Sequence, residues 1–164
     1  MSEKTRVYFA APLFTQAEWQ WNQRIADELI ALGFNVVLPQ KRAEPMLNSV
    51  ESFNAPLLFK ANVSEIDKAD VVLAVFDQPD PDSGTCWECG YAYKAGVPIV
   101  GLRTDLRCAG DDPNAAVNLM LSQSCKELVI LPLDKRDDLL YVAQSVAESL
   151  SRVFNRETGS VEIS

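Results

Sequence analysis

Short apolar runs alternate with longer amphipathic stretches along almost the whole chain. The short runs are rich in Val, Ile, Leu and Phe, as expected of strands that are buried on both faces of a sheet. The longer stretches place apolar residues at helical spacing between capping and stop signals. The pattern predicts five strands, at residues 6–11, 34–38, 70–76, 97–102 and 127–131.

Helices are predicted between these strands. Thr15 and Glu18 have the spacing of a capping box, and Gly33 is placed to end the helix that they begin. Further helices are predicted over residues 54–68, from the loop 77–83 to Gly96, from residue 112 with Pro113 in its first turn, and over residues 137–154. The polar stretch 39–52 is predicted to be a loop long enough to have a binding role.

Strands that alternate with helices predict an α/β fold. We expect a doubly wound five-stranded parallel sheet of the flavodoxin-like or Rossmann-like kind, with strand order 2-1-3-4-5 and helices on both faces. Residues 1–155 are expected to form a single domain, and residues 156–164 a mobile C-terminal tail.

The predicted topology also predicts where a ligand binds. In such sheets the ligand lies beyond the carboxyl ends of the strands, where the winding direction reverses, here between the first and third strands. Residues 8–14 and residues 77–88 meet at that point. The second segment carries two carboxylates, Asp82 and Glu88, on either side of a turn that opens a helix. Paired carboxylates are what glycosyl chemistry requires.

Each of these residues also has a structural interpretation. Glu88 near a helix N-terminus is expected to be ionised and able to attack an anomeric carbon, or else it is a surface residue of a first helical turn. Asp82 is a candidate catalytic carboxylate or the N-cap of the same helix. Gly84 serves the turn or lets the main chain approach a ligand. Asp77 and Asp80 are interpreted as solvated loop charges.

Aromatic side chains are also placed near this edge of the sheet. Tyr8 of the first strand either orients Glu88 through its hydroxyl or packs as a core aromatic. Phe14 and Trp19 are candidates for stacking on a base.

Composition narrows the choice of partners. The formal net charge of −8 and the pI of about 4.5 argue against nucleic acid and anionic membranes, and favour a neutral nucleoside or sugar. Residues 1–6 lead into a strand pattern and not into an apolar signal region, and no run has the length of a membrane span. We therefore expect a cytoplasmic protein.

The chain has no His and four Cys. The absence of His removes Ser-His-Asp and Cys-His mechanisms. Cys86-x-x-Cys89 could be a redox pair or half of a zinc site, but reduced and packed thiols are the favoured interpretation. Neither G-x-G-x-x-G nor a Walker A sequence is present, which argues against dinucleotide and nucleoside triphosphate cofactors.

Three blocks of sequence resemble the nucleoside 2-deoxyribosyltransferase family. They are residues 7–15 (VYFAAPLFT), residues 80–92, and residues 117–121 (VNLML). The middle block is similar to the family's D-x-G-T-x-x-E-x-G signature, which here runs from Asp82 to Gly90.

The resemblance implies a transferase of nucleotide salvage that moves 2-deoxyribose between nucleobases, with deoxynucleosides and free bases as substrates. Glu88 would form a covalent deoxyribosyl ester with net retention, Tyr8 would orient it, and Asp82 would contact the sugar or base. Asn118 and Met120 would reach the 5′ end of the sugar from a neighbouring subunit, which implies a homo-oligomer. The resemblance also implies that no cofactor and no metal are needed.

Base recognition departs from the pattern of many bacterial members. Asn62 stands where they carry an aspartate that is thought to protonate the base, and an amide cannot act as an acid. Asp82 or a bound water would then supply the proton. The chain also ends without the C-terminal aromatic residue of some members.

Two other functions remain open at this point. A related hydrolase would cleave the N-glycosidic bond of (deoxy)nucleoside 5′-monophosphates, although such relatives tend to have a serine where this chain has Asn118. A non-catalytic nucleotide-sensing module would keep the pocket without needing Glu88. Purine or pyrimidine preference and tolerance of a 2′-hydroxyl also stay open.

Overall fold

A five-stranded parallel sheet forms the centre of the molecule. The computed structural model describes residues 4–41 and 53–159. The strand order is β2-β1-β3-β4-β5, so the predicted fold and order are confirmed. The strands are β1 (Arg6–Ala10), β2 (Asn35–Val37), β3 (Val71–Val75), β4 (Ile99–Arg103) and β5 (Glu127–Ile130).

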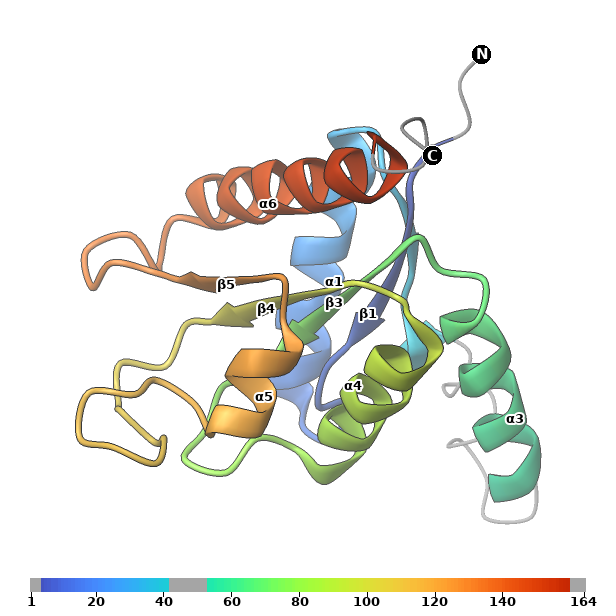
Figure 1. Cartoon of the computed structure of the whole chain (residues 1–164), viewed down its shortest axis with the longest axis horizontal. Coiled ribbons are helices and arrows are strands. Elements are labelled where there is room, and N and C mark those ends of the chain that lie inside the picture. Colours follow the sequence, from blue (N-terminus) through green and yellow to red (C-terminus); the bar gives the residue numbers. More distant parts are fainter. Residues whose placement is uncertain (1–3, 42–52, 160–164) are drawn as a thin grey trace.

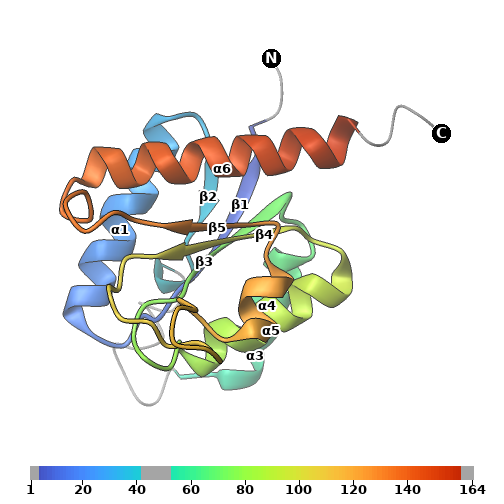
Figure 2. The same ribbon diagram turned by 60° about the vertical axis from the view of Figure 1, so that its left-hand side comes forward.

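Helices cover both faces of this sheet. Figures 1 and 2 show α1 (Gln16–Ala31) and α6 (Leu139–Gly159) on one side, and α3 (Ala55–Ile66), α4 (Ser83–Ala95) and α5 (Leu119–Ser124) on the other. In the described part of the chain no helix has the length and apolarity that crossing a membrane requires.

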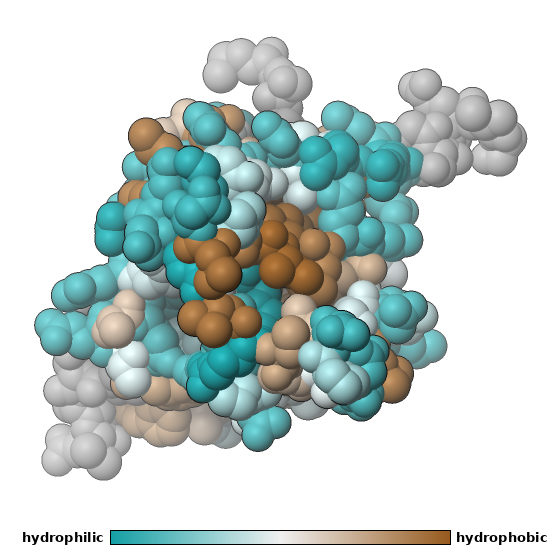
Figure 3. Space-filling model, turned by 90° about the vertical axis from the view of Figure 1, so that its left-hand side faces the viewer, coloured by the Kyte–Doolittle hydropathy of each residue, from teal (hydrophilic) through white to brown (hydrophobic). Residues whose placement is uncertain are grey.

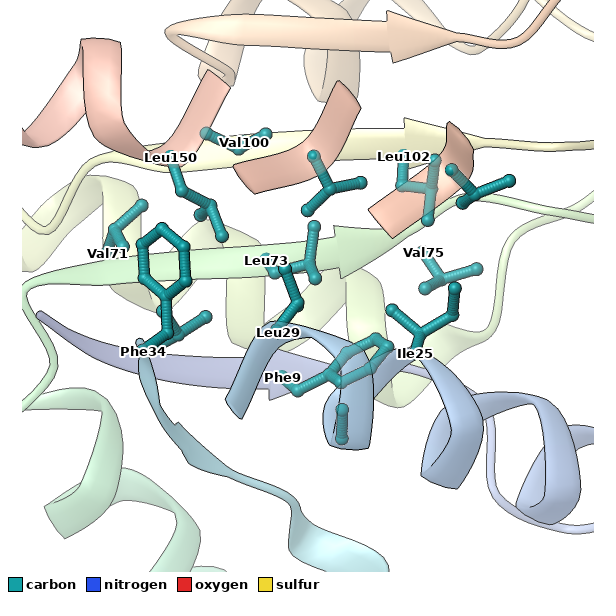
Figure 4. Close-up of a cluster of buried hydrophobic side chains, with 14 of the residues drawn as sticks. Phe9, Ile25, Leu29, Phe34, Val71, Leu73, Val75, Val100, Leu102 and Leu150 are labelled. Atoms are coloured by element: carbon teal, nitrogen blue, oxygen red, sulfur yellow. The ribbon is translucent and has the colours of Figure 1, made fainter. Parts of the chain in front are cut away.

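Successive residues of each central strand pack into different halves of the core. Phe9 and Leu73 belong to the cluster with α1 and α6, part of which Figure 4 shows. Tyr8 and Val72 belong to the other cluster, together with Cys89 of α4. This alternation is the period of two of a β-strand. It turns the hydroxyl of Tyr8 toward α4 and not toward α1.

The capping box at the start of α1 is present as predicted. The N–H of Glu18 donates to Thr15 Oγ1 at 3.2 Å, and the N–H of Thr15 donates to Glu18 Oε2 at 2.8 Å. The same Oε2 accepts the N–H of Phe14 at 2.9 Å. The cap therefore fixes the loop that leaves β1 as well as the helix.

The prediction of a helix that begins at residues 112–113 is wrong. The Asp112 side chain accepts the N–H of Asn114 at 2.8 Å, and the N–H of Gly110 donates to Ala115 O at 2.9 Å, so the segment closes into turns. Helix α5 begins only after Asn118, whose side chain accepts the N–H of Met120 at 2.9 Å.

Two other predicted boundaries differ from the structure. Residues 39–41 are helical and not part of a loop, and the rest of the predicted loop, residues 42–52, lies outside the described residues. Helix α6 continues to Gly159, past its expected end at residue 154. Residues 160–164 of the expected tail also lie outside the described residues.

The central strand β3 provides a test of this core. Leu73 is 0% exposed and packs between β1, β4 and the α1–α6 layer, so Leu73→Ala should lower the free energy of unfolding by about 2–5 kcal/mol. The same substitution at Leu133, which is 70% exposed, should change it by less than about 0.5 kcal/mol. Urea unfolding followed by circular dichroism measures both. Equal effects of the two substitutions would contradict this packing.

Candidate active site

A cleft of about 270 Å³ lies where the first and third strands diverge. The loop after β1, helix α3 and the first turns of α4 line it. It therefore occupies the place that the topology predicts for a ligand. Figure 3 views the molecule from the side toward which β3, β4 and β5 point, where apolar side chains gather among hydrophilic ones.

The structure brings six of the eight predicted site residues together. Five of them line the cleft: Phe14, Asn62, Asp82, Gly84 and Glu88. The sixth, Tyr8, is joined to the cleft by a hydrogen bond. Their roles in binding and catalysis stay predictions.

The hydroxyl of Tyr8 donates a hydrogen bond of 2.6 Å to Glu88 Oε1. Tyr8 is 0% exposed and belongs to β1, so the sheet fixes its position. Tyr8 therefore packs in the core and also holds one oxygen of Glu88, as its orienting role requires; the role itself stays a prediction. A short bond from a hydroxyl to a carboxylate is among the stronger hydrogen bonds in proteins.

The environment of Glu88 raises the pKa of its carboxyl from about 4.5 to about 7. Burial is the main cause and the negative charge of Asp82 adds to it, while the hydrogen bond from Tyr8 acts in the opposite direction. The helix N-terminus therefore does not keep the pKa of Glu88 at its ordinary value, and the carboxyl is protonated more easily than that of an exposed glutamate. Since α4 begins after Asp82, Glu88 lies in its second turn, beyond the free N–H groups of the first turn.

Asp82 is the N-cap of α4. Its Oδ2 accepts the N–H of Thr85 at 2.8 Å and the hydroxyl of the same residue at 3.2 Å. A Cβ on Gly84 would lie 3.0 Å from Asp82 Oδ2, so the glycine leaves room for this cap. The structural interpretation of Asp82 is thus correct, and the residue also lines the cleft.

Of the two aromatic residues considered for stacking, the cleft has only Phe14 in its described lining. Phe14 is 77% exposed and stands at the rim. Trp19 packs elsewhere: its indole N–H donates to Leu13 O, and its ring lines a separate hollow with Gln40.

Asn118 and Met120 do not reach this cleft. They lie at the start of α5, where Met120 is 71% exposed and lines a different, apolar hollow with Cys86 and Cys89. The structure holds one chain, so their contribution to the site of a neighbouring subunit stays a prediction.

All four cysteines are free thiols. Burial raises the pKa of Cys89 and raises that of Cys125 to about 11, which keeps both thiols protonated. Within residues 4–41 and 53–159, His, Cys, Asp and Glu side chains form no cluster of three or more that could hold a metal ion.

Two charged side chains with structural partners, Arg103 and Asp77, were not found from the sequence; the first is buried and the second partly buried. Arg103, at the end of β4, is 0% exposed, and its guanidinium donates to main-chain carbonyls of two loops. Asp77 is not a solvated loop charge, since its carboxylate accepts the N–H groups of Thr104 and Asp105. From sequence alone, a charged residue next to a strand is expected at the surface. No sequence pattern indicated that Arg103 and Asp77 bind main-chain groups of other segments.

Glu65 was also missed. It is buried on α3, forms an ion pair with Arg6, and lines a hollow of about 350 Å³ together with Tyr8 and Asn62. Asn62 lines both this hollow and the cleft, so the two adjoin. Residues three apart on a helix lie on the same side, so the spacing of Asn62 and Glu65 could have predicted that both face the same hollow.

Replacement of Glu88 by glutamine should stabilise the protein at high pH. Because the native pKa is about 7 and the ordinary value about 4.5, the stability tied to the protonated carboxyl is complete below pH 4.5 and is lost as the pH rises through 7. The free energy of unfolding of Glu88→Gln should therefore exceed that of wild type by about 1–3 kcal/mol at pH 8, and the two should differ little at pH 5.

Chemical denaturation at the two pH values measures this difference. The control is Glu148→Gln on α6, whose side chain is 73% exposed. A Glu88→Gln variant that matches wild type at pH 8 would show that Glu88 is not held in an environment that disfavours its charge.

Comparison with known proteins identifies the family. The sequence model of the family described as Nucleoside 2-deoxyribosyltransferase matches residues 7–120. No curated protein matches the chain.

Several solved structures share the fold. A conserved protein from Enterococcus faecalis V583 is 26% identical, with a TM-score of 0.69 over 87% of this chain and 98% of that one. A 2-deoxyribosyltransferase from Bacillus psychrosaccharolyticus is 24% identical, with a TM-score of 0.62 over 83% and 90%. The Clostridium botulinum CMP N-glycosidase BcmB is 20% identical, with a TM-score of 0.52 over 84% and 96%. Since the family model covers more than half of its length, the chain belongs to the nucleoside 2-deoxyribosyltransferase family.

Proposed function

We propose that this protein transfers 2-deoxyribose between nucleobases, with Glu88 as the nucleophile. The observation that carries the proposal is the 2.6 Å hydrogen bond from Tyr8 to Glu88 at the cleft, in a chain of this family. The Bacillus psychrosaccharolyticus enzyme, a 2-deoxyribosyltransferase with the same fold, supports it.

Glu88 acts first as a nucleophile. Its free carboxylate oxygen attacks C1′ of the deoxynucleoside, the C1′–N bond breaks, and the base leaves with the bonding electrons. Tyr8 holds the other oxygen, so the attacking oxygen has a fixed direction. A second base then attacks C1′ of the glycosyl ester and releases Glu88, and two inversions give net retention.

The proton balance involves the residues around Glu88. The leaving base takes up a proton, supplied by Asp82 or by a water, because the amide of Asn62 offers hydrogen bonds but no acid. The incoming base gives its N–H proton back to the same group when it attacks C1′, so the exchange consumes no proton. With a pKa of about 7, Glu88 is ionised in a large fraction of molecules at neutral pH. Burial of the carboxylate raises its basicity and makes it a stronger nucleophile once it is ionised.

The charges of the cleft favour a free 5′-hydroxyl over a 5′-phosphate. Among the described residues that line it, Asp82 and Glu88 are acidic and none is basic. A phosphate dianion would meet like charge there. Hydrolysis of a nucleoside monophosphate, the activity named for the Clostridium botulinum relative, is therefore the competing outcome of the test.

Base exchange should be observed and should require Glu88. Deoxyinosine incubated with adenine should give deoxyadenosine and hypoxanthine, and Glu88→Ala should reduce the rate by about 10³-fold or more, as expected when a nucleophile is removed. Chromatography of the products measures the reaction, and Glu148→Ala is the matched control at an exposed position.

The two competing functions give different products. Hypoxanthine released at the same rate with or without adenine, and without a new nucleoside, would identify a hydrolase. Turnover of deoxynucleoside monophosphates in preference to deoxynucleosides would contradict the proposed substrate class. Binding without turnover of any of these compounds would indicate a sensing module.

Removal of the Tyr8 hydroxyl should displace the pH profile. The hydrogen bond from Tyr8 lowers the pKa of Glu88, so Tyr8→Phe should raise that pKa further. The acid limb of the kcat/KM profile, near pH 7 in wild type, should move to higher pH, and the maximal rate should fall by about 10- to 100-fold.

The matched control for this change is Tyr141→Phe on α6. Its ring is partly exposed and is contacted by Lys135, away from the cleft. Initial rates measured between pH 5 and 9 test the shift. A limb that stays in place in Tyr8→Phe would mean that the titrating group is not Glu88.

A further inference from the structure

A buried arginine holds the loop that leads into α4. Arg103 donates through Nη1 to Phe76 O and, at 3.1 Å, to Gln78 O, and through Nη2 to Arg107 O at 2.7 Å. In the described part of the chain no carboxylate hydrogen-bonds to this guanidinium. A fully buried cation costs stability unless hydrogen bonds or nearby charges compensate it. Here three main-chain carbonyls accept from the guanidinium, and the negative charge of Asp105 is close enough to interact with it.

Asp77 joins the same two loops from the opposite direction. Its Oδ1 accepts the N–H of Thr104 at 2.6 Å and that of Asp105 at 2.9 Å, and its Oδ2 accepts the Thr104 hydroxyl at 2.5 Å. The loop after β3 and the loop after β4 thus each supply a charged side chain that binds the main chain of the other. The direction in which the chain leaves β3 is fixed on both sides.

Gln78 lies between these bonds in a strained conformation. Its φ of +78° is in the left-handed region, which is uncommon for a residue with a side chain. Its N–H donates to Asp105 Oδ2 at 3.1 Å, and its side-chain amide donates to Glu18 Oε1 at 3.1 Å. The other oxygen of Glu18 binds the N–H of Phe14, so the bonds reach the loop that lines the cleft.

Such strain persists only where the surroundings enforce it, and it tends to occur at functional sites. Four residues after Gln78, Asp82 caps α4, and six residues further Glu88 meets Tyr8. A change in the turn at residue 78 would therefore alter where α4 begins and where its glutamate points.

We propose that Arg103 is a positioning residue for Glu88 and that it acts by holding the left-handed turn at Gln78. It touches neither the substrate nor the reacting atoms. The inference rests on the proposed function for its kinetic consequence, but its structural consequence, a fixed first turn of α4, is independent of any activity.

The test replaces Arg103 by lysine, which keeps the charge but cannot span three carbonyls. Arg103→Lys should lower kcat for base exchange by about 10- to 100-fold while KM changes less than about threefold, because the nucleophile is misplaced and the rest of the cleft is kept. Arg152→Lys, the same change at an exposed arginine of α6 that pairs with Glu127, is the matched control and should leave both constants unchanged.

Hydrogen exchange supplies the readout that needs no activity. The N–H of Thr85 donates to the Asp82 side chain and that of Cys86 to Asp82 O. Both amides should exchange about tenfold faster in Arg103→Lys, while amides of α6 keep their wild-type rates. Unchanged exchange at these two amides overturns the proposal whether or not the protein proves to be a transferase.

A second substitution separates positioning from simple loss of stability. Glycine adopts a positive φ without strain. Adding Gln78→Gly to Arg103→Lys should therefore raise kcat at least about threefold above that of Arg103→Lys alone. A merely structural role would give a double variant that is more stable but no faster, and that result overturns the proposal.

If Arg103→Lys does not fold, Asp77→Asn is subjected to the same two measurements, and wild-type kcat and exchange in that variant overturn it.

Discussion

The hydrogen bond between Tyr8 and Glu88 depends on most of the fold and fixes the carboxylate on which the proposed reaction rests. It joins the middle of the sheet to the second turn of α4, two places that are 80 residues apart in the chain. The bond forms only if β1 and β3 pair in the observed register, because the chain leaves β3 to begin α4 beside Tyr8. Register, helix start and carboxylate orientation are thus parts of one constraint. A slip of one residue in β1 would turn Tyr8 into the opposite layer of the core.

Much of this arrangement follows from the sequence because it depends on periodicity. The buried runs around Val7 and Leu73 have the composition of central parallel strands, and the handedness of their connections determines the strand order. That order places the turn before α4 next to the end of β1, so the meeting of these two segments could be predicted without knowledge of any contact. The bond between Tyr8 and Glu88 was one of two interpretations that the pattern left open. The capping box of Thr15 was equally accessible, because its two bonds are local in sequence.

The features that sequence did not reveal are those that depend on tertiary surroundings. Pro113 has a favourable position for a helix start, but the Asp112 side chain and the contact of Gly110 with Ala115 stabilise turns instead. The position of Arg103 at the end of a strand suggests a surface residue. In the structure its guanidinium instead donates to two carbonyls after β3 and to the carbonyl of Arg107, four residues along its own chain. The pKa of Glu88 is raised by burial, which the position of the residue along a helix does not disclose.

For the proposed nucleophile Glu88, burial involves a trade between the stability of the protein and the reactivity of the carboxylate. A solvated glutamate would cost nothing to ionise, but it would be a weaker nucleophile and free to rotate. In the lining of the cleft, charge on Glu88 is opposed by lost solvation and by Asp82, and the Tyr8 hydroxyl counters these effects. The same Asp82 caps α4, so the residue that raises the cost of the charge also fixes the helix that presents it. Removing Asp82 to ease ionisation would therefore loosen the geometry that makes ionisation useful, which is why neither carboxylate can be optimised independently of the other.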